Sequence, residues 1–344
     1  MKILVAMSGG VDSTVAAKML IDEGHEVAGA YMKMLPDDFE LASDSSDARK
    51  AAEKLGIPFY EFDVSNEFHK NVLEYFCESY IKGSTPNPCI ICNQTMKFGI
   101  FIDKATELGF DYIATGHYAK IVRDGNDVFL MRSADLKKDQ SYFLHGLKKE
   151  QLKRAIFPLE GADKEYVRKI AEECGFDNAA KKDSQDICFV KTAPGAYVEF
   201  IEKFIGQSMK SGLFKDVNGN ILGTHEGIAR YTIGQRKGVK TAFGKPLYVV
   251  SKSAEDQTVV MGENEMLFSD TVKVSNFNLI FKDFDENNIT AKHRYGQKDV
   301  PARLEIDGNM AIVKFDTPQR AVTPGQFLVV YDGDIVVGGG EIQL

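Results

Sequence analysis

The chain has 344 residues, of which 44% are hydrophobic and 27% charged, and its formal net charge is −8. This composition is typical of a globular protein, and the length exceeds what one core usually organises, which predicts two or three domains. No apolar run approaches the roughly 20 residues of a membrane-spanning helix. The first predicted strand begins at residue 2, so we expect no signal peptide. We therefore expect a cytoplasmic protein without a membrane partner.

Residues 1 to about 135 alternate between apolar runs typical of strands and apolar periodicity typical of helices. The predicted strands are 2–7, 25–32, 59–64 and 111–116, and the predicted helices are 11–23, 45–55, 67–82 and 93–108. This alternation predicts a parallel sheet covered by helices on both faces. Ligands of such sheets bind beyond the carboxyl ends of the strands, where the first loop, Met32 and Gly116 should converge.

The first strand ends in a glycine loop that opens onto a helix, in the segment Ala6-Met7-Ser8-Gly9-Gly10-Val11-Asp12-Ser13. Two adjacent glycines let backbone N–H groups converge, and the helix N-terminus adds unpaired donors, so the segment predicts an anion site, most simply for phosphate. It is neither a Walker A loop nor a dinucleotide-binding G-x-G-x-x-G motif. It resembles the pyrophosphate loop of the N-type ATP pyrophosphatases; the alternative is an ordinary strand-to-helix turn.

Five cysteines occur, and their odd number argues against a disulfide scaffold. Cys89 and Cys92 lie in the segment 85–93, which is predicted as a rigid loop that runs into a helix, and the helix N-terminus should lower the thiol pKa and make a thiolate available. Cys188 lies in a polar segment, whereas Cys77 and Cys174 fall inside helical patterns and should be buried and inert. By itself C-x-x-C fits a redox dithiol, half a zinc site, part of an iron–sulfur site or two unrelated thiols.

The pattern changes after residue 135. Helices are predicted at 141–152 and 164–174, and from about 209 short strands separated by glycine turns replace them. Hairpin turns are predicted at 217–220, 306–309 and 331–334, and alternation over 300–315 and 327–342 favours a small antiparallel barrel. We place domain boundaries near 195 and 262, which gives domains 1–195, 196–262 and 263–344.

The negative net charge is weak evidence against a nucleic-acid partner, because binding follows local patches. Basic pairs occur at 137–138, 148–149, 181–182 and 236–237, with Lys240 close to the last. Each such pair is more often a solvated surface than a binding face.

Taken together, the motifs resemble the tRNA-specific 2-thiouridylase (MnmA) family. The matching stretches, in the family's order, are 6–13, 31–33, 85–93, 114–119, 138–144, 184–189, 231–236 and 294–295. The resemblance implies an α/β fold: an adenine nucleotide alpha-hydrolase-like catalytic domain with a parallel sheet, a small central tRNA-facing connector, and a C-terminal antiparallel β-barrel. It also implies an enzyme that adenylates the 2-oxygen of the wobble uridine with ATP and then delivers sulfur through cysteines.

The resemblance also assigns roles to single residues. Cys92 would be the nucleophile and Cys188 the persulfide carrier. A disulfide bond between these two cysteines is compatible with the roles, but the sequence does not show whether it is present in the resting protein. ATP would be bound by Ala6, Met7, Ser8, Gly9, Gly10, Val11, Asp12, Ser13, Met32 and Gly116. The target base would contact Asn87, Pro88 and Cys89, and the rest of the tRNA would contact His117, Lys138, Asp139, Gln140, Arg294, Tyr295 and Gln326. Mg²⁺ is implied by the pyrophosphate leaving group, with Asp12 as a candidate ligand.

One position departs from the commoner form of the family, which has an aspartate where this chain has Cys89. Cys89, Cys92 and Cys188 together would suit an iron–sulfur cluster with one open iron, as an alternative to the persulfide route. Two other functions also remain open: an ATP pyrophosphatase acting on a small metabolite, and a tRNA-binding protein that uses ATP only as a structural ligand. The sulfur donor, a protein or sulfide, is not identified by the sequence.

Overall fold

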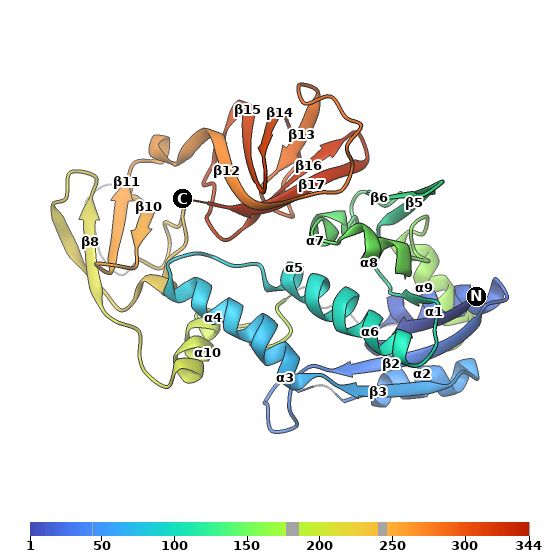
Figure 1. Ribbon diagram of the computed structural model, residues 1–344. Coiled ribbons are helices and arrows are strands. Elements are labelled where there is room, and N and C mark those ends of the chain that lie inside the picture. The colour runs from blue at the N-terminus through green and yellow to red at the C-terminus, as the bar shows by residue number, and fades with distance from the viewer. Residues whose placement is uncertain (43, 177–185, 240–245, 344) are drawn as a thin grey trace.

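The computed structural model describes residues 1–42, 44–176, 186–239 and 246–343. Three bodies are visible in Figure 1: a parallel sheet with its helices, a small sheet formed by β8 to β11, and a barrel formed by β12 to β17. None of the described helices combines the length and apolar character that a membrane crossing requires.

The N-terminal body is a five-stranded parallel sheet in the order β3-β2-β1-β4-β7. Its strands are β1 (Lys2–Ala6), β2 (Glu26–Lys33), β3 (Phe59–Asp63), β4 (Tyr112–Ala114) and β7 (Ala155–Ile156). The predicted parallel sheet is therefore confirmed, and β7 escaped prediction because two residues carry no periodic signal.

Helices cover both faces of this sheet. On one face Ile3 and Val5 pack with α1 (Val11–Asp22) and α2 (Ser46–Leu55), and α9 (Lys164–Glu173) packs on α1. On the other face Leu4 packs beneath a helix that begins at Pro88. Successive residues of a strand point to opposite faces, so one apolar run supplies both cores.

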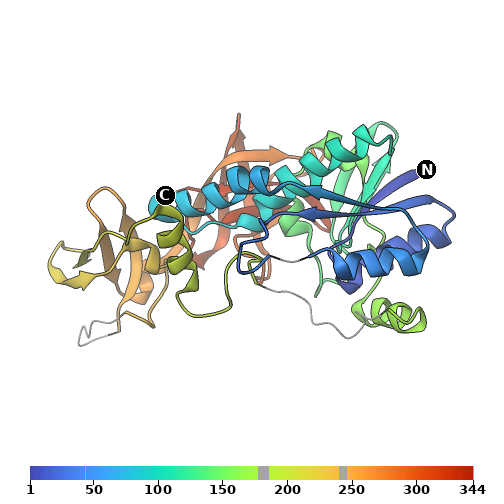
Figure 2. The same cartoon turned by 90° about the horizontal axis from the view of Figure 1, so that it is seen from below.

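Two long helices carry π-helical segments in their middles. The first comprises α3 (Ser65–Phe68), η1 (His69–Leu73) and α4 (Glu74–Ile81), and it reaches from the parallel sheet toward the central body, as Figure 2 shows from below. The second comprises α5 (Pro88–Cys92), η2 (Asn93–Ile100) and α6 (Phe101–Glu107). It starts five residues before the predicted position, because Pro88 occupies the first helical turn, where proline is tolerated. Cys89 and Cys92 therefore lie in the helix rather than in a preceding loop.

The helix predicted at 141–152 is two short helices, α7 (Ser141–Leu144) and α8 (Lys149–Arg154). The Asn278 side chain donates to the carbonyls of His145 and Leu147, at 2.8 and 2.9 Å, and so binds backbone groups that a continuous helix would use. A Cβ atom on Gly146 would overlap the Gln94 side chain, so this break also brings the backbone against the second long helix.

The central body follows α10 (Ala196–Ile205) and has the strand order β10-β11-β8-β9. The strands are β8 (Gly212–Asp216), β9 (Ile221–His225), β10 (Tyr248–Ser253) and β11 (Thr258–Gly262), with short 3₁₀ turns η3 (Ile228–Arg230) and η4 (Asn264–Leu267). β8 and β9 are antiparallel and flank the hairpin turn predicted at 217–220.

The C-terminal body is the predicted antiparallel barrel, closed by the pairing of β12 with β17. Its strands are β12 (Phe268–Leu279), β13 (Ile289–Lys292), β14 (Val300–Asp307), β15 (Met310–Arg320), β16 (Phe327–Asp332) and β17 (Ile335–Ile342). The turns between β14 and β15 and between β16 and β17 lie where the glycine signals predicted them.

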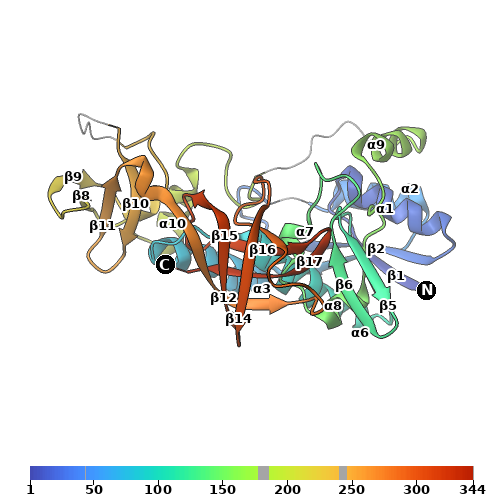
Figure 3. The same ribbon diagram turned by 90° about the horizontal axis from the view of Figure 1, so that it is seen from above.

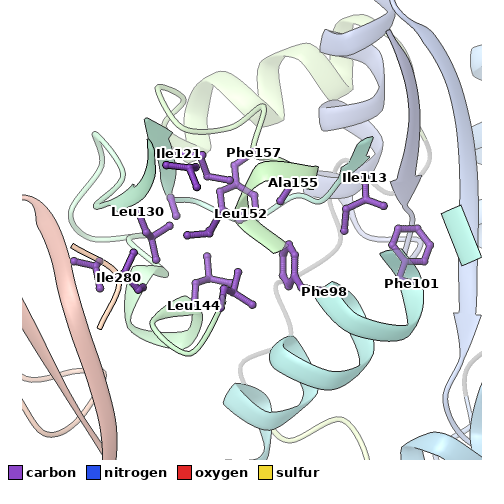
Figure 4. Packing of buried hydrophobic residues seen from close by; sticks show 14 of the residues in the cluster. Phe98, Phe101, Ile113, Ile121, Leu130, Leu144, Leu152, Ala155, Phe157 and Ile280 are labelled. Atoms are coloured by element: carbon purple, nitrogen blue, oxygen red, sulfur yellow. The ribbon is translucent and has the colours of Figure 1, made fainter. Parts of the chain in front are cut away.

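A hairpin of the N-terminal half, β5 (Lys120–Asp124) and β6 (Asp127–Met131), joins the barrel sheet beside β17, as Figure 3 shows from above. The cores of the two bodies are continuous, and Ile280 lies beside Leu130 and Leu144 in Figure 4. The partner of this hairpin could not be predicted, because strand pairing over some 200 residues has no local pattern.

Candidate functional site

The glycine loop between β1 and α1 has the form of an anion cradle. Gly9 has φ +76°, and a Cβ atom there would come within 2.9 Å of the Asp47 Cβ on α2, so both conformation and space require glycine. Ser13 Oγ donates to the Gly10 carbonyl at 3.0 Å and accepts from Ser8 N at 3.3 Å, which closes the loop on itself. Gly10 is the N-cap of α1 and has no capping side chain, so the helix N-terminus faces the loop with its N–H groups available to an anion.

Gly116 and Met32 lie at the same carboxyl edge of the sheet as this loop. Gly116 follows β4, and a Cβ atom there would lie 2.8 Å from both the Asp12 carbonyl carbon and Ser13 N. Met32 lies near the end of β2, which pairs with β1 through Ala6. The predicted convergence of residues 6–13, Met32 and Gly116 is therefore what the fold produces.

Asp12 is held by two residues from other elements. Lys164 Nζ, at the start of α9, is 2.8 and 2.9 Å from the two carboxylate oxygens, and Tyr118 OH donates to one of them at 2.8 Å. Lys164 could not be predicted as a partner of Asp12, because it is 152 positions away in the chain. The described residues contain no group of three or more His, Cys, Asp or Glu side chains placed to hold a metal ion.

Cys89, Cys92 and Cys188 lie close enough for their charges to interact. Negative charge on Cys89 or Cys188 raises the pKa of Cys92, and charge on Cys89 raises that of Cys188. Cys92 is buried, whereas Cys89 and Cys188 are exposed, and all five cysteines of the chain are free thiols. The fold thus brings together the three cysteines that the resemblance singled out, while Ser184 and Gln185 of the Cys188 motif lie outside the described residues.

The expectation of a lowered thiol pKa is wrong for this conformation. Desolvation is the largest influence on all three thiols, and it raises the pKa of Cys92 to about 12. Lys97 opposes this effect at each of the three. Lys97 is five residues after Cys92, in the π-helical segment where i to i+5 hydrogen bonds align such residues. Its role could not be predicted, because a lone lysine after C-x-x-C carries no specific signal in the sequence.

The remaining cysteines only partly follow expectation. Cys77 is buried, and desolvation raises its pKa to about 12, so it is inert as predicted. Cys174 is partly exposed at the end of α9 rather than buried, because the helix stops there.

His117 lies between the glycine loop and the cysteine helix. Its ring contacts Phe98 and Phe157, and its Nδ1 is 2.7 Å from Thr115 Oγ1. Desolvation, with a smaller effect of Lys97, holds the pKa of His117 well below its ordinary value, so the imidazole is neutral at pH 7.

The segment 138–140 is mostly turned inward. Asp139 is buried, and its carboxylate accepts from Ser133 N, Ser141 N and Ser141 Oγ at 3.2, 3.1 and 2.8 Å. Gln140 Oε1 accepts from Tyr118 N at 3.0 Å. Lys138 is half-buried. Asp139 and Gln140 therefore shape the segment, and their side-chain oxygens already have partners.

The barrel residues Arg294 and Tyr295 meet this segment from the other side. The Tyr295 ring, 40% exposed, lies 4.5 Å from the ring of Phe143 on α7. Arg294 Nη2 donates to the Ala321 carbonyl at 2.7 Å and to Thr323 Oγ1 at 2.9 Å. Gln326 lies in the same turn as Thr323, and its side chain donates to the Thr85 carbonyl at 2.8 Å. Of the basic pairs, Lys181, Lys182 and Lys240 lie outside the described residues.

One helix joins these parts. Asn93, next to Cys92, donates to the Phe143 carbonyl at 3.1 Å, and Phe98 contacts His117. The helix that begins at Pro88 therefore carries Cys89 and Cys92. Through Phe98 it contacts His117, the neighbour of the Gly116 that lies against the glycine loop, and through Asn93 it contacts Phe143, which packs on Tyr295. The arrangement suits a reaction that binds a phosphate-bearing ligand and uses thiol chemistry beside it.

Comparison with known proteins agrees along the whole chain. Residues 1–192 match the tRNA methyl transferase HUP domain, 198–263 the tRNA methyl transferase PRC-barrel domain, and 269–342 the Aminomethyltransferase beta-barrel domain. The chain is 48% identical to the tRNA-specific 2-thiouridylase MnmA of Acetivibrio thermocellus, covering 99% of both chains. It is 46% identical to that of Treponema denticola, covering 100% of this chain and 98% of the relative.

Among solved structures, a 4-thiouridine synthetase–RNA complex with bound ATP covers 60% of this chain and 50% of its own, with a TM-score of 0.38 and 18% identity. This similarity is too low to support the family assignment. The family assignment rests on full-length identity of nearly one half, together with three consecutive domain matches. The chain belongs to the tRNA-specific 2-thiouridylase MnmA family.

Proposed function

We propose that this protein replaces the 2-oxygen of the wobble uridine of tRNA with sulfur, using ATP. The observation that carries the proposal is that Cys89 and Cys92 lie on a helix whose Phe98 contacts His117, and the preceding Gly116 lies against the glycine loop of ATP-pyrophosphatase type. Membership of the 2-thiouridylase family supports it. We propose further that the protein works in the cytoplasm and that its domains divide near residues 195 and 262.

The first step is adenylation. A uridine carbonyl oxygen leaves poorly, whereas the same oxygen bound to the α-phosphorus of AMP leaves well. The loop 6–13, with Met32 and Gly116, binds ATP, and the N–H groups at the start of α1 face its phosphates. The uridine 2-oxygen attacks the α-phosphorus and pyrophosphate departs. Mg²⁺ would neutralise charge on the departing pyrophosphate, and Asp12 fits poorly as its ligand because Lys164 and Tyr118 already bind its carboxylate oxygens.

The second step is sulfur transfer. The terminal sulfur of a persulfide on Cys188 attacks C2 of the adenylated uridine, which forms the C–S bond and expels AMP. The Cys92 thiolate then attacks Cys188 Sγ, breaks the S–S bond and leaves the sulfur on the base. The product is a Cys92–Cys188 disulfide, which an external dithiol reduces. The persulfide on Cys188 is regenerated when a persulfide-bearing donor protein transfers its outer sulfur to the reduced Cys188 thiolate. In place of that reduction, sulfide can attack Cys188 Sγ in the Cys92–Cys188 disulfide, which forms the Cys188 persulfide and releases the Cys92 thiolate.

The pKa of about 12 for Cys92 sets a condition on this step. The thiol must lose its proton only when the site is assembled, and the Lys97 ammonium, which lowers the pKa of Cys92, can stabilise the thiolate. Holding the thiol protonated until then also limits wasteful oxidation.

An iron–sulfur route fits the described residues less well. Cys89, Cys92 and Cys188 influence one another electrostatically, yet they are not arranged as a metal-binding group. We therefore derive no step through a cluster, and treat Cys89 as a residue of the base pocket with Asn87 and Pro88. The base must leave the anticodon stack to reach that pocket. Lys138 and Tyr295 carry the outer tRNA contact, with smaller parts for His117 and Arg294.

The deciding experiment is thiolation of unmodified tRNA with ATP, Mg²⁺ and sulfide, comparing the intact protein with Cys89→Ser, Cys92→Ser and Cys188→Ser. Cys174→Ser is the matched control, since it is partly exposed and outside the site. We expect Cys92→Ser and Cys188→Ser to abolish thiolation while the control retains it. Loss in all three site variants, tracking iron content, would favour the cluster instead.

The two rival functions are separated in the same assay. Pyrophosphate release driven by ammonia or an amino acid without tRNA would favour a small-metabolite ATP pyrophosphatase. Tight tRNA binding without AMP formation would favour a non-catalytic binding protein. Either result from the intact protein would refute the proposed function.

A further inference from the structure

A turn of the barrel, residues 323–326, lies directly against the segment that leads into the cysteine helix; we call it the anchoring turn. Thr85 N donates to the Pro324 carbonyl at 2.9 Å. Gln326 Nε2 donates to the Thr85 carbonyl at 2.8 Å and to the Pro86 carbonyl at 3.4 Å. A Cβ atom on Gly325 would lie 2.8 Å from Ser84 Cβ and 2.9 Å from Thr85 N, so the two backbones touch.

The segment that receives these contacts has no helix or strand of its own between α4 and α5. Buried or half-buried backbone groups need partners, and here the barrel supplies them for both the N–H and the carbonyl of Thr85. Asn87, the N-cap of α5, follows at once, and Cys89 and Cys92 lie within the next five residues. The placement of the C-x-x-C helix start thus depends on a turn about 240 residues away in the chain.

The anchoring turn is itself firmly held. Gly325 N donates to the Ile342 carbonyl at 3.1 Å, and Ile342 N donates to the Gln326 carbonyl at 2.8 Å, which fixes the turn on β17. On its other side Arg294 binds Thr323 Oγ1. The same turn therefore contacts both the barrel residue expected at the tRNA surface and the catalytic segment.

We propose that Gln326 is a positioning residue: it holds the 84–87 segment, and through it the start of the cysteine helix, rather than serving mainly as a tRNA contact. Its amide hydrogens are committed to two backbone carbonyls of this chain. The kinetic part of this proposal rests on the proposed function. The structural part does not, and it makes the barrel a support of the active site.

The test compares Gln326→Ala, Gln326→Glu and Gly325→Ala with the intact protein. The glutamate variant keeps the side-chain length but has no hydrogen to donate. Two controls are matched. Gln343→Ala removes an exposed glutamine just after β17 whose side chain donates to the Glu341 carbonyl, and Gly308→Ala alters a positive-φ glycine with open space around it. Thermal melting establishes that each variant is folded.

Two measurements separate positioning from tRNA contact. The first is thiolation against tRNA concentration: we expect kcat to fall about 10- to 100-fold, as for a small misplacement of reacting groups, while the tRNA KM stays within about twofold. The second is the rate of haloacetamide labelling of Cys89 and Cys92, measured without ATP or tRNA, which we expect to change at least about threefold in all three variants.

A direct contact between Gln326 and tRNA predicts the opposite result, with a change in tRNA binding and none in kcat. If tRNA binding weakens about tenfold while saturated kcat and thiol labelling stay unchanged, Gln326 binds tRNA and the proposal is overturned. If the intact protein does not thiolate tRNA at all, the proposed function fails, yet the labelling rates still decide whether the turn positions the cysteines. Should Gly325→Ala not fold, the two Gln326 variants carry the decision.

Discussion

Replacing Gly116 with alanine should disable nucleotide binding by a purely steric route. The added methyl would lie 2.8 Å from the Asp12 carbonyl carbon and from Ser13 N, and 3.1 Å from the Asp12 Cβ. Gly116 does not have a positive φ, so the change strains no dihedral. The first turn of α1 or the β4 loop must move by about 0.6 Å to restore ordinary contact.

That displacement has two costs. Overpacking of this kind destabilises a protein by about 1–3 kcal/mol. Misaligning one or two backbone N–H groups that bind charged phosphate loses about 1.5–3 kcal/mol for each, which corresponds to a rise in the ATP Kd of about 10-fold or more. The measurement is ATP affinity by calorimetry together with the urea midpoint.

Gly161→Ala is the matched control for this experiment, because it also lacks a positive φ and has nothing within 4 Å of its added Cβ. We expect it to leave ATP affinity unchanged. An unaltered ATP Kd in a normally folded Gly116→Ala protein would show that the contact between the β4 loop and α1 does not shape the nucleotide site.

Two further predictions concern charge. Lys164→Gln leaves the Asp12 carboxylate beside the phosphate loop without its cation, so ATP affinity should fall about 10-fold at low salt and by less at high salt. Lys169→Gln, which breaks an exposed ion pair on the same helix, is the control and should leave ATP affinity unchanged. An equal loss of ATP affinity in both variants would contradict this prediction. His145 and His293 are buried, and desolvation lowers the pKa of each to about 4, so the unfolded chain binds protons that the folded chain does not, and stability should fall as the pH drops from 6.5 toward 4. At pH 5 each histidine should lower the free energy of unfolding by about 2 kcal/mol relative to pH 7. The drop in the urea midpoint between pH 7 and pH 5 should therefore be smaller in His293→Phe than in His69→Phe, an exposed control. Equal drops in the two variants would refute the assignment.

The sequence was informative wherever one short stretch carries the whole physical requirement. The adjacent glycines and Ser13 predict the anion loop, because the conformation they need is local. The alternation of strands and helices predicts the parallel sheet and the edge at which Met32 and Gly116 meet. Glycine hairpin signals predict the turns of the barrel.

The errors arose where tertiary contacts override local pattern. The helical periodicity at 141–152 is real, yet Asn278 and the close approach of Gly146 to Gln94 interrupt it. Helix N-terminal position suggested a reactive Cys92, but burial has the larger effect on its pKa. Asp139 looks like a surface residue by composition and is instead buried by hydrogen bonds to Ser133 and Ser141.

The β5–β6 hairpin has a consequence for how the molecule can be divided. Because β6 pairs with β17 and the apolar core runs from Leu130 into Ile280, the first and last bodies share main-chain hydrogen bonds and buried surface. They should melt in a single cooperative transition, and a fragment ending before residue 268 should expose an unpaired strand edge and aggregate. Two domains at opposite ends of the sequence are therefore expected to behave as a single cooperative unit.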